Sequence, residues 1–181
     1  MTRMAQGREA AGSALNVLNQ QLYKLSTENQ YVTFQIGGEE YGIEIMLVQE
    51  IIRYHTPTRV FNASPVIRGV INFRGKVIPV IDMYRKFNLP EQQPDEFTVV
   101  IVIESGRKTM GMMVDRVSDI LSFDSEDIQV VDRDFAEDIK AEHIKGIARF
   151  AERIILLLDP ERVLSLAEQK EVQELNASEQ S

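Results

Sequence analysis

The first thirty residues carry a helical pattern. Leu15, Leu18, Leu22 and Leu25 are spaced by three, four and three positions, which places them on one face of an α-helix. A leucine stripe of this kind covers apolar surface, either on the helix's own domain or in a two-heptad coiled coil. Because a coiled coil is usually recognised over three or four heptads, the pattern favours packing on the same domain.

From Tyr31 onward the hydrophobic period changes to two, and β-branched and aromatic residues become frequent. Alternation predicts β-strands, and short turn-forming segments between two such runs predict hairpins. Residues 117–123 and 128–131 are shorter strand candidates. About eight to ten short strands separated by turns favour small β-barrels over an alternating α/β fold. The expected hairpins join 31–36 to 41–45, 69–73 to 77–81, 97–103 to 109–114, and 144–150 to 153–158.

Short helices are predicted at three further places. Residues 46–52 are typical of a short helix or turn, and Asp82 is well placed to cap a helix that runs through Lys86. Asp159 followed by Pro160 predicts the start of a C-terminal helix, which we expect to fray by Asn176. The apolar face of that helix would consist of Val163, Leu164, Leu166 and Ala167.

Composition narrows the class of protein. The 181 residues include no cysteine and two histidines, which excludes disulfides, thiolate metal sites and cysteine nucleophiles. Neither a signal-peptide pattern nor an uncharged apolar run of membrane-spanning length is present, so we expect a soluble cytoplasmic protein. The net charge is -8, and residues 91–142 hold fourteen acidic against five basic residues. This balance argues against nucleic-acid binding, which depends on basic surface.

Catalytic motifs are missing from the sequence. There is no phosphate-binding loop, dinucleotide fingerprint, nucleophile elbow or zinc-protease helix. The acidic residues around 124–138 do not follow the spacing of an EF-hand, so a solubilising loop is favoured over a metal site. We therefore expect no catalytic residues, no metal and no cofactor. An enzyme that uses a pair of carboxylates is the weakest hypothesis, and a small β-barrel that binds single-stranded nucleic acid is disfavoured by charge and by the lack of tryptophan.

Several motifs follow one another along the chain: YGIEI at 41–45, VQEI at 48–51, IRGVINFRGKVIPVID at 67–82, GMMVDRV at 111–117 and IKGI at 144–147. This ordered set, which extends from about Gln30 to Leu166, resembles the CheW family of chemotaxis coupling proteins. Several ordered motifs over such a span are far more specific than any one of them.

The resemblance implies a mainly β fold of two interlocked SH3-like five-stranded β-barrels with short helices, plus N-terminal and C-terminal helices. It divides the chain into a helical extension (1–29), a CheW-like domain of two intertwined barrel subdomains (30–166), and a helix end with a frayed tail (167–181). It also implies a non-enzymatic adaptor that links methyl-accepting chemoreceptors to the histidine kinase CheA, with no nucleic-acid partner and no insertion into the membrane. A coupling protein of a non-flagellar pathway, for pili or surface sensing, is the alternative.

Six residues are predicted to bind partners. By position, the resemblance implies receptor or kinase contacts at Val48, Glu50, Gly69 and Arg74. Arg74 should be exposed at a hairpin tip, Glu50 should face solvent, and Val48 is equally consistent with a place in the core. Gly69 is expected to permit a close backbone approach or a local bend. The set is completed by two basic residues that belong to the same motif, Arg68 and Lys76.

Overall fold

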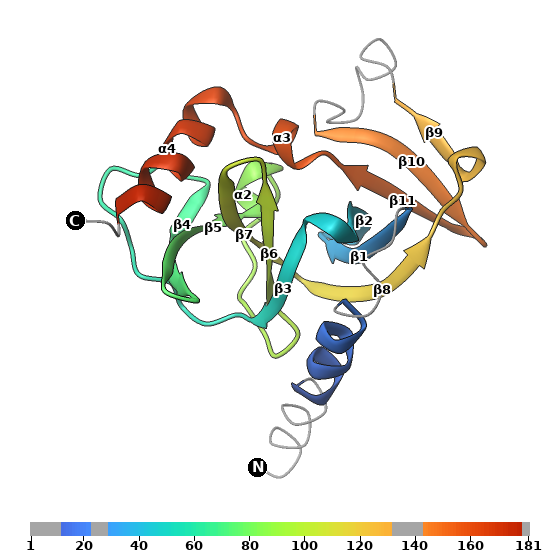
Figure 1. Ribbon diagram of the computed structural model, residues 1–181, viewed down its shortest axis with the longest axis horizontal. Helices are drawn as coiled ribbons and strands as arrows, with labels where there is room; N and C mark the ends of the chain where they lie inside the picture. The colour runs from blue at the N-terminus through green and yellow to red at the C-terminus, as the bar shows by residue number, and fades with distance from the viewer. Residues whose placement is uncertain (1–11, 23–28, 132–142, 179–181) are drawn as a thin grey trace.

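Two β-sheets form the body of the molecule, in a computed structural model that describes residues 12–22, 29–131 and 143–178 (Figure 1). The first sheet has the order β8-β1-β2-β11-β10-β9 and the second the order β3-β6-β7-β5-β4. The first consists of β1 (Gln30–Ile36), β2 (Glu39–Glu44), β8 (Arg116–Ser122), β9 (Ile128–Val130), β10 (Ile144–Phe150) and β11 (Arg153–Leu158). The second consists of β3 (Val48–Arg53), β4 (Ile67–Phe73), β5 (Lys76–Asp82), β6 (Val99–Ser105) and β7 (Lys108–Val114).

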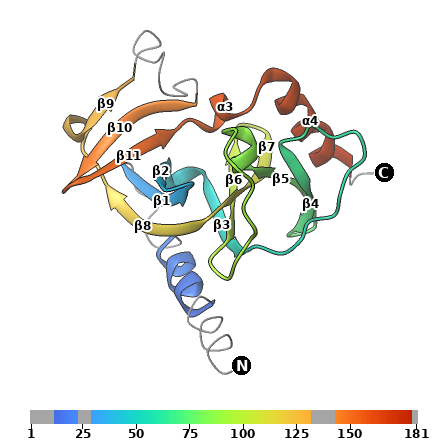
Figure 2. The ribbon, with the colours of Figure 1, turned by 180° about the vertical axis from the view of Figure 1, so that it is seen from behind.

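The chain interlocks the two sheets. It starts in the first sheet, builds the whole second sheet, and returns to complete the first, so that β11 pairs in parallel with β2. In the second sheet, β5 likewise pairs in parallel with β7. Figures 1 and 2 show the two sheets side by side, and the chain crosses from one to the other between β2 and β3 and between β7 and β8. The four predicted hairpins and the mainly β, two-barrel class are confirmed; the short β9 gives the first sheet a sixth strand.

Three apolar clusters fill this framework. The largest draws on both sheets and contains, for example, Phe34 from β1 and Ile101 from β6, each with no exposed surface. Each sheet also has a small core of its own, one around Ile155 and one around Ile78. Close packing of one shared interior holds the barrels in a fixed relation, because neither can move without opening apolar surface to water.

The segment that leads into β3 differs from its prediction. Helix there is limited to the three-residue turn η1 (Ile45–Leu47), and residues from Val48 onward are extended. Ile45 is buried within the turn, and β3 begins directly after it with Val48 and Ile51 buried. The pairing of β3 with β6 shifts register between Val48 and Glu50, which accounts for a spacing of three between the two buried residues. The Asp82 cap is confirmed: its side chain accepts hydrogen bonds from the first backbone N–H groups of α2 (Met83–Lys86). A further single turn, η2 (Ser125–Asp127), precedes β9.

The C-terminal region contains two helices where one was predicted. Asp159 caps α3 (Pro160–Val163), and Ser165 then starts α4 (Leu166–Ala177). Ser165 and Glu168 form a capping box, in which each side chain bonds the other's backbone N–H, and this fixes a new helix start. The predicted apolar face is therefore wrong in part: Leu166 is 84% exposed.

Helix α4 packs against β5 and β7, and its end is held firmly. The predicted fraying at Asn176 is wrong, because this side chain bonds three backbone groups. Its amide nitrogen donates to the carbonyls of Val77 and Thr109, and its oxygen accepts from the N–H of Thr109 at 3.0 Å. An asparagine near the end of α4 thus fastens the helix to the sheet where β5 and β7 separate.

Residues 12–22 are helical, as predicted. Leu15 and Leu22 pack against the large shared core, so this helix covers its own domain, as the short leucine stripe indicated. Leu25, the last leucine of that stripe, lies outside the described residues.

Candidate partner-binding surface

The tip of the β4–β5 hairpin presents Arg74 to solvent. Arg74 and Gly75 both have positive φ, 51° and 80°, and the Asn72 side chain accepts a hydrogen bond from the Gly75 N–H at 2.9 Å. Glycine adopts this conformation freely, whereas the arginine is held in it by the turn around it. The Arg74 guanidinium lies over the Phe73 ring, 4.9 Å from its centre, with its side chain 61% exposed.

Glu50 of β3 lies beside this tip. Its carboxylate is 3.8 Å from the Arg74 guanidinium, and its side chain is 34% exposed. The ion pair connects β3 with the tip that follows β4. These are the two outer strands of the second sheet, so the pair lies where the barrel closes. Val48, on the same strand, is 8% exposed and belongs to the shared core, as the packing interpretation of this residue predicted.

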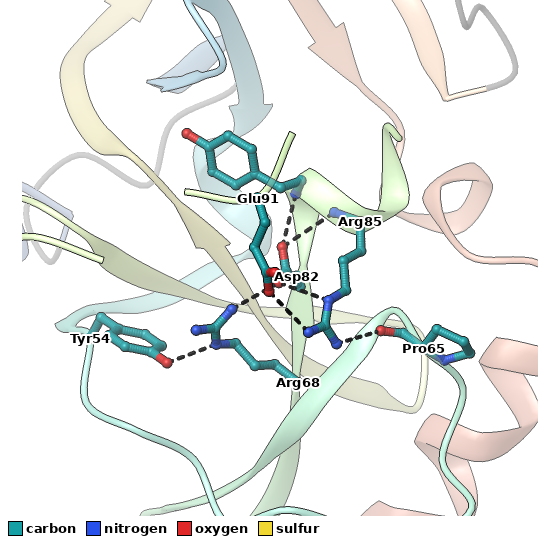
Figure 3. A network of polar contacts seen from close by, with 7 residues as sticks. Tyr54, Pro65, Arg68, Asp82, Arg85 and Glu91 are labelled. Atoms are coloured by element: carbon teal, nitrogen blue, oxygen red, sulfur yellow. Dashed lines mark hydrogen bonds and ion pairs between the residues drawn. The ribbon is translucent and has the colours of Figure 1, made fainter. Parts of the chain in front are cut away.

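The other end of β4 carries a buried polar network, which Figure 3 shows from close by. Asp82 at its centre is 1% exposed. Its Oδ2 atom lies 3.0 Å from Arg68 Nη1 and 3.6 Å from Arg85 Nε. Its Oδ1 atom accepts the backbone N–H groups of Tyr84 and Arg85. A buried carboxylate is stable in this position because two cations and two N–H groups replace its hydration.

Arg68 is fixed within this network. Its Nε donates to the Tyr54 hydroxyl at 2.8 Å, and the guanidinium also faces the Tyr54 ring. Burial alone would lower the pKa of Arg68, but the hydrogen bonds to Tyr54 and Asp82 outweigh burial and raise the pKa above its ordinary value. Arg68 is therefore held as a structural cation, 21% exposed.

A hollow of about 860 Å³ opens beside this network. Four arginines line it, but Asp95 and Glu96 line it too, and Asp82 and Glu91 already pair with two of the arginines. The local charges therefore balance, and the hollow has no net attraction for an anion. The lining arginines are Arg53, Arg59, Arg68 and Arg85.

Gly69 permits a close backbone approach, as its sequence context predicted. A Cβ atom at this position would lie 2.5 Å from the carbonyl oxygen of Thr58. That carbonyl accepts from the N–H of Val70, and the Thr58 N–H donates to the Val70 carbonyl, so the loop pairs with β4 at this point. Lys76, at the start of β5, donates to Thr109 Oγ1 at 2.9 Å.

The six predicted residues thus divide between two places. Glu50 and Arg74 meet on one exposed surface, and Lys76 begins the strand that leaves the same hairpin tip. Val48 is core, while Arg68 and Gly69 organise the far end of β4. From the sequence, Asp82 was expected only to cap a helix. Its ion pairs with the arginines could have been suspected from its position, because it is a single carboxylate at the end of an apolar strand.

Other kinds of site receive no support in the described part of the chain. Among these residues no group of three or more histidine, cysteine, aspartate or glutamate side chains is placed to hold a metal ion. The acidic residues 132–138 lie outside the described residues. No helix within the described ranges is long and apolar enough to cross a membrane.

Comparison with known proteins gives one consistent result. A family profile described as the CheW-like domain matches residues 30–168. The chain is 41% identical to the chemotaxis protein CheW of Klebsiella aerogenes over 139 residues, which cover 77% of this chain and 83% of the relative. It is 31% identical to the chemotaxis protein CheW of Bacillus subtilis, over 78% of this chain and 90% of the relative.

The fold is matched as well. The crystal structure of the scaffolding protein TtCheW from Thermoanaerobacter tengcongensis superposes with a TM-score of 0.71 at 25% sequence identity, covering 78% of this chain and 96% of that structure. Family profile, relatives and architecture agree, and the chain belongs to the CheW-like family.

Proposed function

We propose that this chain is a non-enzymatic chemotaxis coupling protein that joins the cytoplasmic tip of methyl-accepting chemoreceptors to the histidine kinase CheA. The observation that carries the proposal is the Glu50–Arg74 surface: a charged pair displayed at a hairpin tip by a chain of the CheW-like family. Arginine is favoured at the centre of protein interfaces, because its planar guanidinium binds carboxylates and carbonyls along two directions.

The architecture suits an adaptor. Two barrels that share one core offer two outer surfaces at a fixed distance and orientation. An adaptor changes kinase activity only if its complex with the receptor favours one state of the kinase, because tethering alone shifts no equilibrium. A rigid link between the two surfaces supports such coupling, since a movement at one barrel is transmitted to the other instead of being absorbed.

The location of the chain in the cell would be set by its partners. The chain would be recruited from the cytoplasm to membrane-associated receptor arrays by its receptor contact, with no insertion of its own. Each contact can be individually weak, because many linked contacts in an array increase the overall affinity. The curated relatives are named chemotaxis proteins, which favours chemotaxis over a pathway for pili or surface sensing.

The test is a binding experiment with charge reversal at the tip. The Arg74→Glu variant should bind a CheA fragment or a receptor fragment at least about 30-fold more weakly, the loss expected for an interface anchor worth about 2 kcal/mol. Thermal stability should change little, because an exposed ion pair contributes about 0–1 kcal/mol. Arg107→Glu, the same charge change at the exposed β6–β7 hairpin tip, is the matched control.

A double variant separates an internal role from a partner contact. Glu50→Arg combined with Arg74→Glu restores the internal ion pair with reversed orientation. Recovery of binding in the double variant would show that the residues act only on each other, whereas continued weak binding supports contact with a partner. If the wild-type chain binds neither CheA nor receptor fragments in calorimetry, the coupling function is wrong.

A further inference from the structure

The N-terminal helix contacts the open edge of β3. This strand is the first in its sheet and pairs only with β6 among the described strands. On the edge of β3 that faces away from β6, the Asn19 side chain forms hydrogen bonds with the backbone N–H and carbonyl of Ile51. Its Nδ2 donates to the Ile51 carbonyl at 3.0 Å, and its Oδ1 accepts from the Ile51 N–H at 3.1 Å. A neighbouring strand would satisfy the same two groups, so the amide stands in for a strand residue.

Apolar contacts flank this pair of hydrogen bonds. Leu15 and Leu22, four positions before and three after Asn19, pack against the shared core to which Ile51 belongs. The three residues form one stripe along the helix. Figures 1 and 2 show the helix below the two sheets, next to β8 and the lower end of β3, and pointing away from the barrels. The surface beside β3 is therefore complementary to a helix that presents an amide between two leucines.

The same helix lies beside the predicted partner residue Glu50. A hollow of about 360 Å³ is lined by Glu50 and by Asn16, Asn19 and Gln20 of the helix. Any partner that reaches Glu50 from this side meets the helix first.

The two terminal helices are attached very differently. Helix α4 is held by the buried Lys86–Glu168 ion pair, by a bond from the Ser64 N–H to Glu171, and by the three bonds of Asn176. Helix 12–22 bonds the sheet through the Asn19 side chain, whose two hydrogen bonds both go to Ile51. A second helix that presents an amide between two leucines at the same spacing can therefore compete for the same edge of β3.

We propose that residues 12–22 occupy, in the free chain, the site on β3 that takes a helix of the chemoreceptor tip, so that the two helices exclude each other. The inference rests on the proposed coupling function and adds a regulation to it. The partner helix is expected to present an asparagine or glutamine between two leucine-like residues, in the spacing of Leu15, Asn19 and Leu22. The N-terminal segment then acts as a competitor within the same chain and lowers the apparent affinity for the receptor.

Two substitutions on the helix test this competition. Asn19→Ala removes both bonds to Ile51, whereas Asn16→Ala changes an amide of the same helix that makes neither bond. Both raise helix propensity by a similar amount, so propensity does not distinguish them. Titrated with a receptor cytoplasmic fragment in calorimetry, Asn19→Ala should bind about 3- to 10-fold more tightly than wild type, and Asn16→Ala should be unchanged.

Amide hydrogen exchange supplies a readout that does not depend on the receptor. The Ile51 N–H should exchange faster in Asn19→Ala than in wild type, because its acceptor is lost. Faster exchange at Ile51 with unchanged or weaker receptor binding would overturn the competition, as would unchanged exchange at Ile51. If no variant binds the receptor fragment, the coupling function fails as well, and the exchange data still report whether the helix holds the edge of β3.

Discussion

The buried carboxylate of Asp82 should be the most sensitive polar group in the second barrel. It faces Arg68 and Arg85 and also caps α2, so one side chain holds together β4, β5 and the helix that follows. Asp82→Asn keeps an oxygen for the cap but removes the charge between two guanidinium groups. Asp82→Ala removes the charge and the cap together.

The magnitudes follow from burial. Breaking a buried ion pair by removing one partner costs about 3–5 kcal/mol, and we place Asp82→Asn at the lower end because Arg68 keeps partial contact with water. Asp82→Ala should cost about 1 kcal/mol more, the usual contribution of an N-cap. Glu91→Gln is the control: this carboxylate pairs with Arg85 at 3.2 Å but is 68% exposed, so its loss should cost at most about 1 kcal/mol.

Urea unfolding followed by circular dichroism measures these differences. With a slope near 2 kcal/mol/M, a loss of about 3 kcal/mol lowers the midpoint by about 1.5 M. The slope should stay unchanged if the variants alter stability alone. A midpoint for Asp82→Asn within about 0.5 M of wild type, or equal to that of Glu91→Gln, would refute the view that the network organises this barrel.

Two further predictions concern the helix α4 contact and the loop beside β4. Burial alone would raise the pKa of Glu168, but the hydrogen bond from Lys86 and the Ser165 contacts outweigh it and lower the pKa below its ordinary 4.5. Glu168 therefore binds its proton less readily in the folded chain than in the unfolded chain. The resulting stabilisation is present above pH 4.5 and is lost as the pH falls below this value. Glu168→Gln should flatten the stability–pH profile below pH 4.5. Gly69→Ala should lower the stability of the fold by about 1–3 kcal/mol in thermal unfolding, because the added Cβ meets the Thr58 carbonyl. Gly106→Ala is the control, since a Cβ at that position meets nothing. A loss at Gly69 no larger than the loss at Gly106 would contradict the steric reason.

The parts of the fold that were predictable depend on local signals. The four hairpins follow from a period of two interrupted by turn residues, and the Asp82 cap follows from one residue before a short helix. The break between α3 and α4 was also readable, since Ser165 and Glu168 have the spacing of a capping box. That signal was overlooked because the apolar positions on both sides continue one helical period.

The site was less predictable because its contacts join distant parts of the chain. Arg68 looks like an exposed cation in the sequence, and only the approach of Tyr54 and Asp82 in the folded barrel makes it a structural one. Asn19 and Ile51 lie 32 positions apart, and no pattern in the sequence marks their pairing. Glu50 and Arg74 were named from the family resemblance, whereas their contact depends on closure of the barrel.

A coupling protein of the kind proposed makes the activity of CheA depend on the receptor. The most direct measurement is the rate of CheA autophosphorylation in membranes that contain receptors, with and without the purified chain, before and after a receptor ligand is added. We expect the ligand to change the rate when the chain is present and to leave it unchanged when the chain is omitted. Equal control by the ligand in both mixtures would contradict the coupling function.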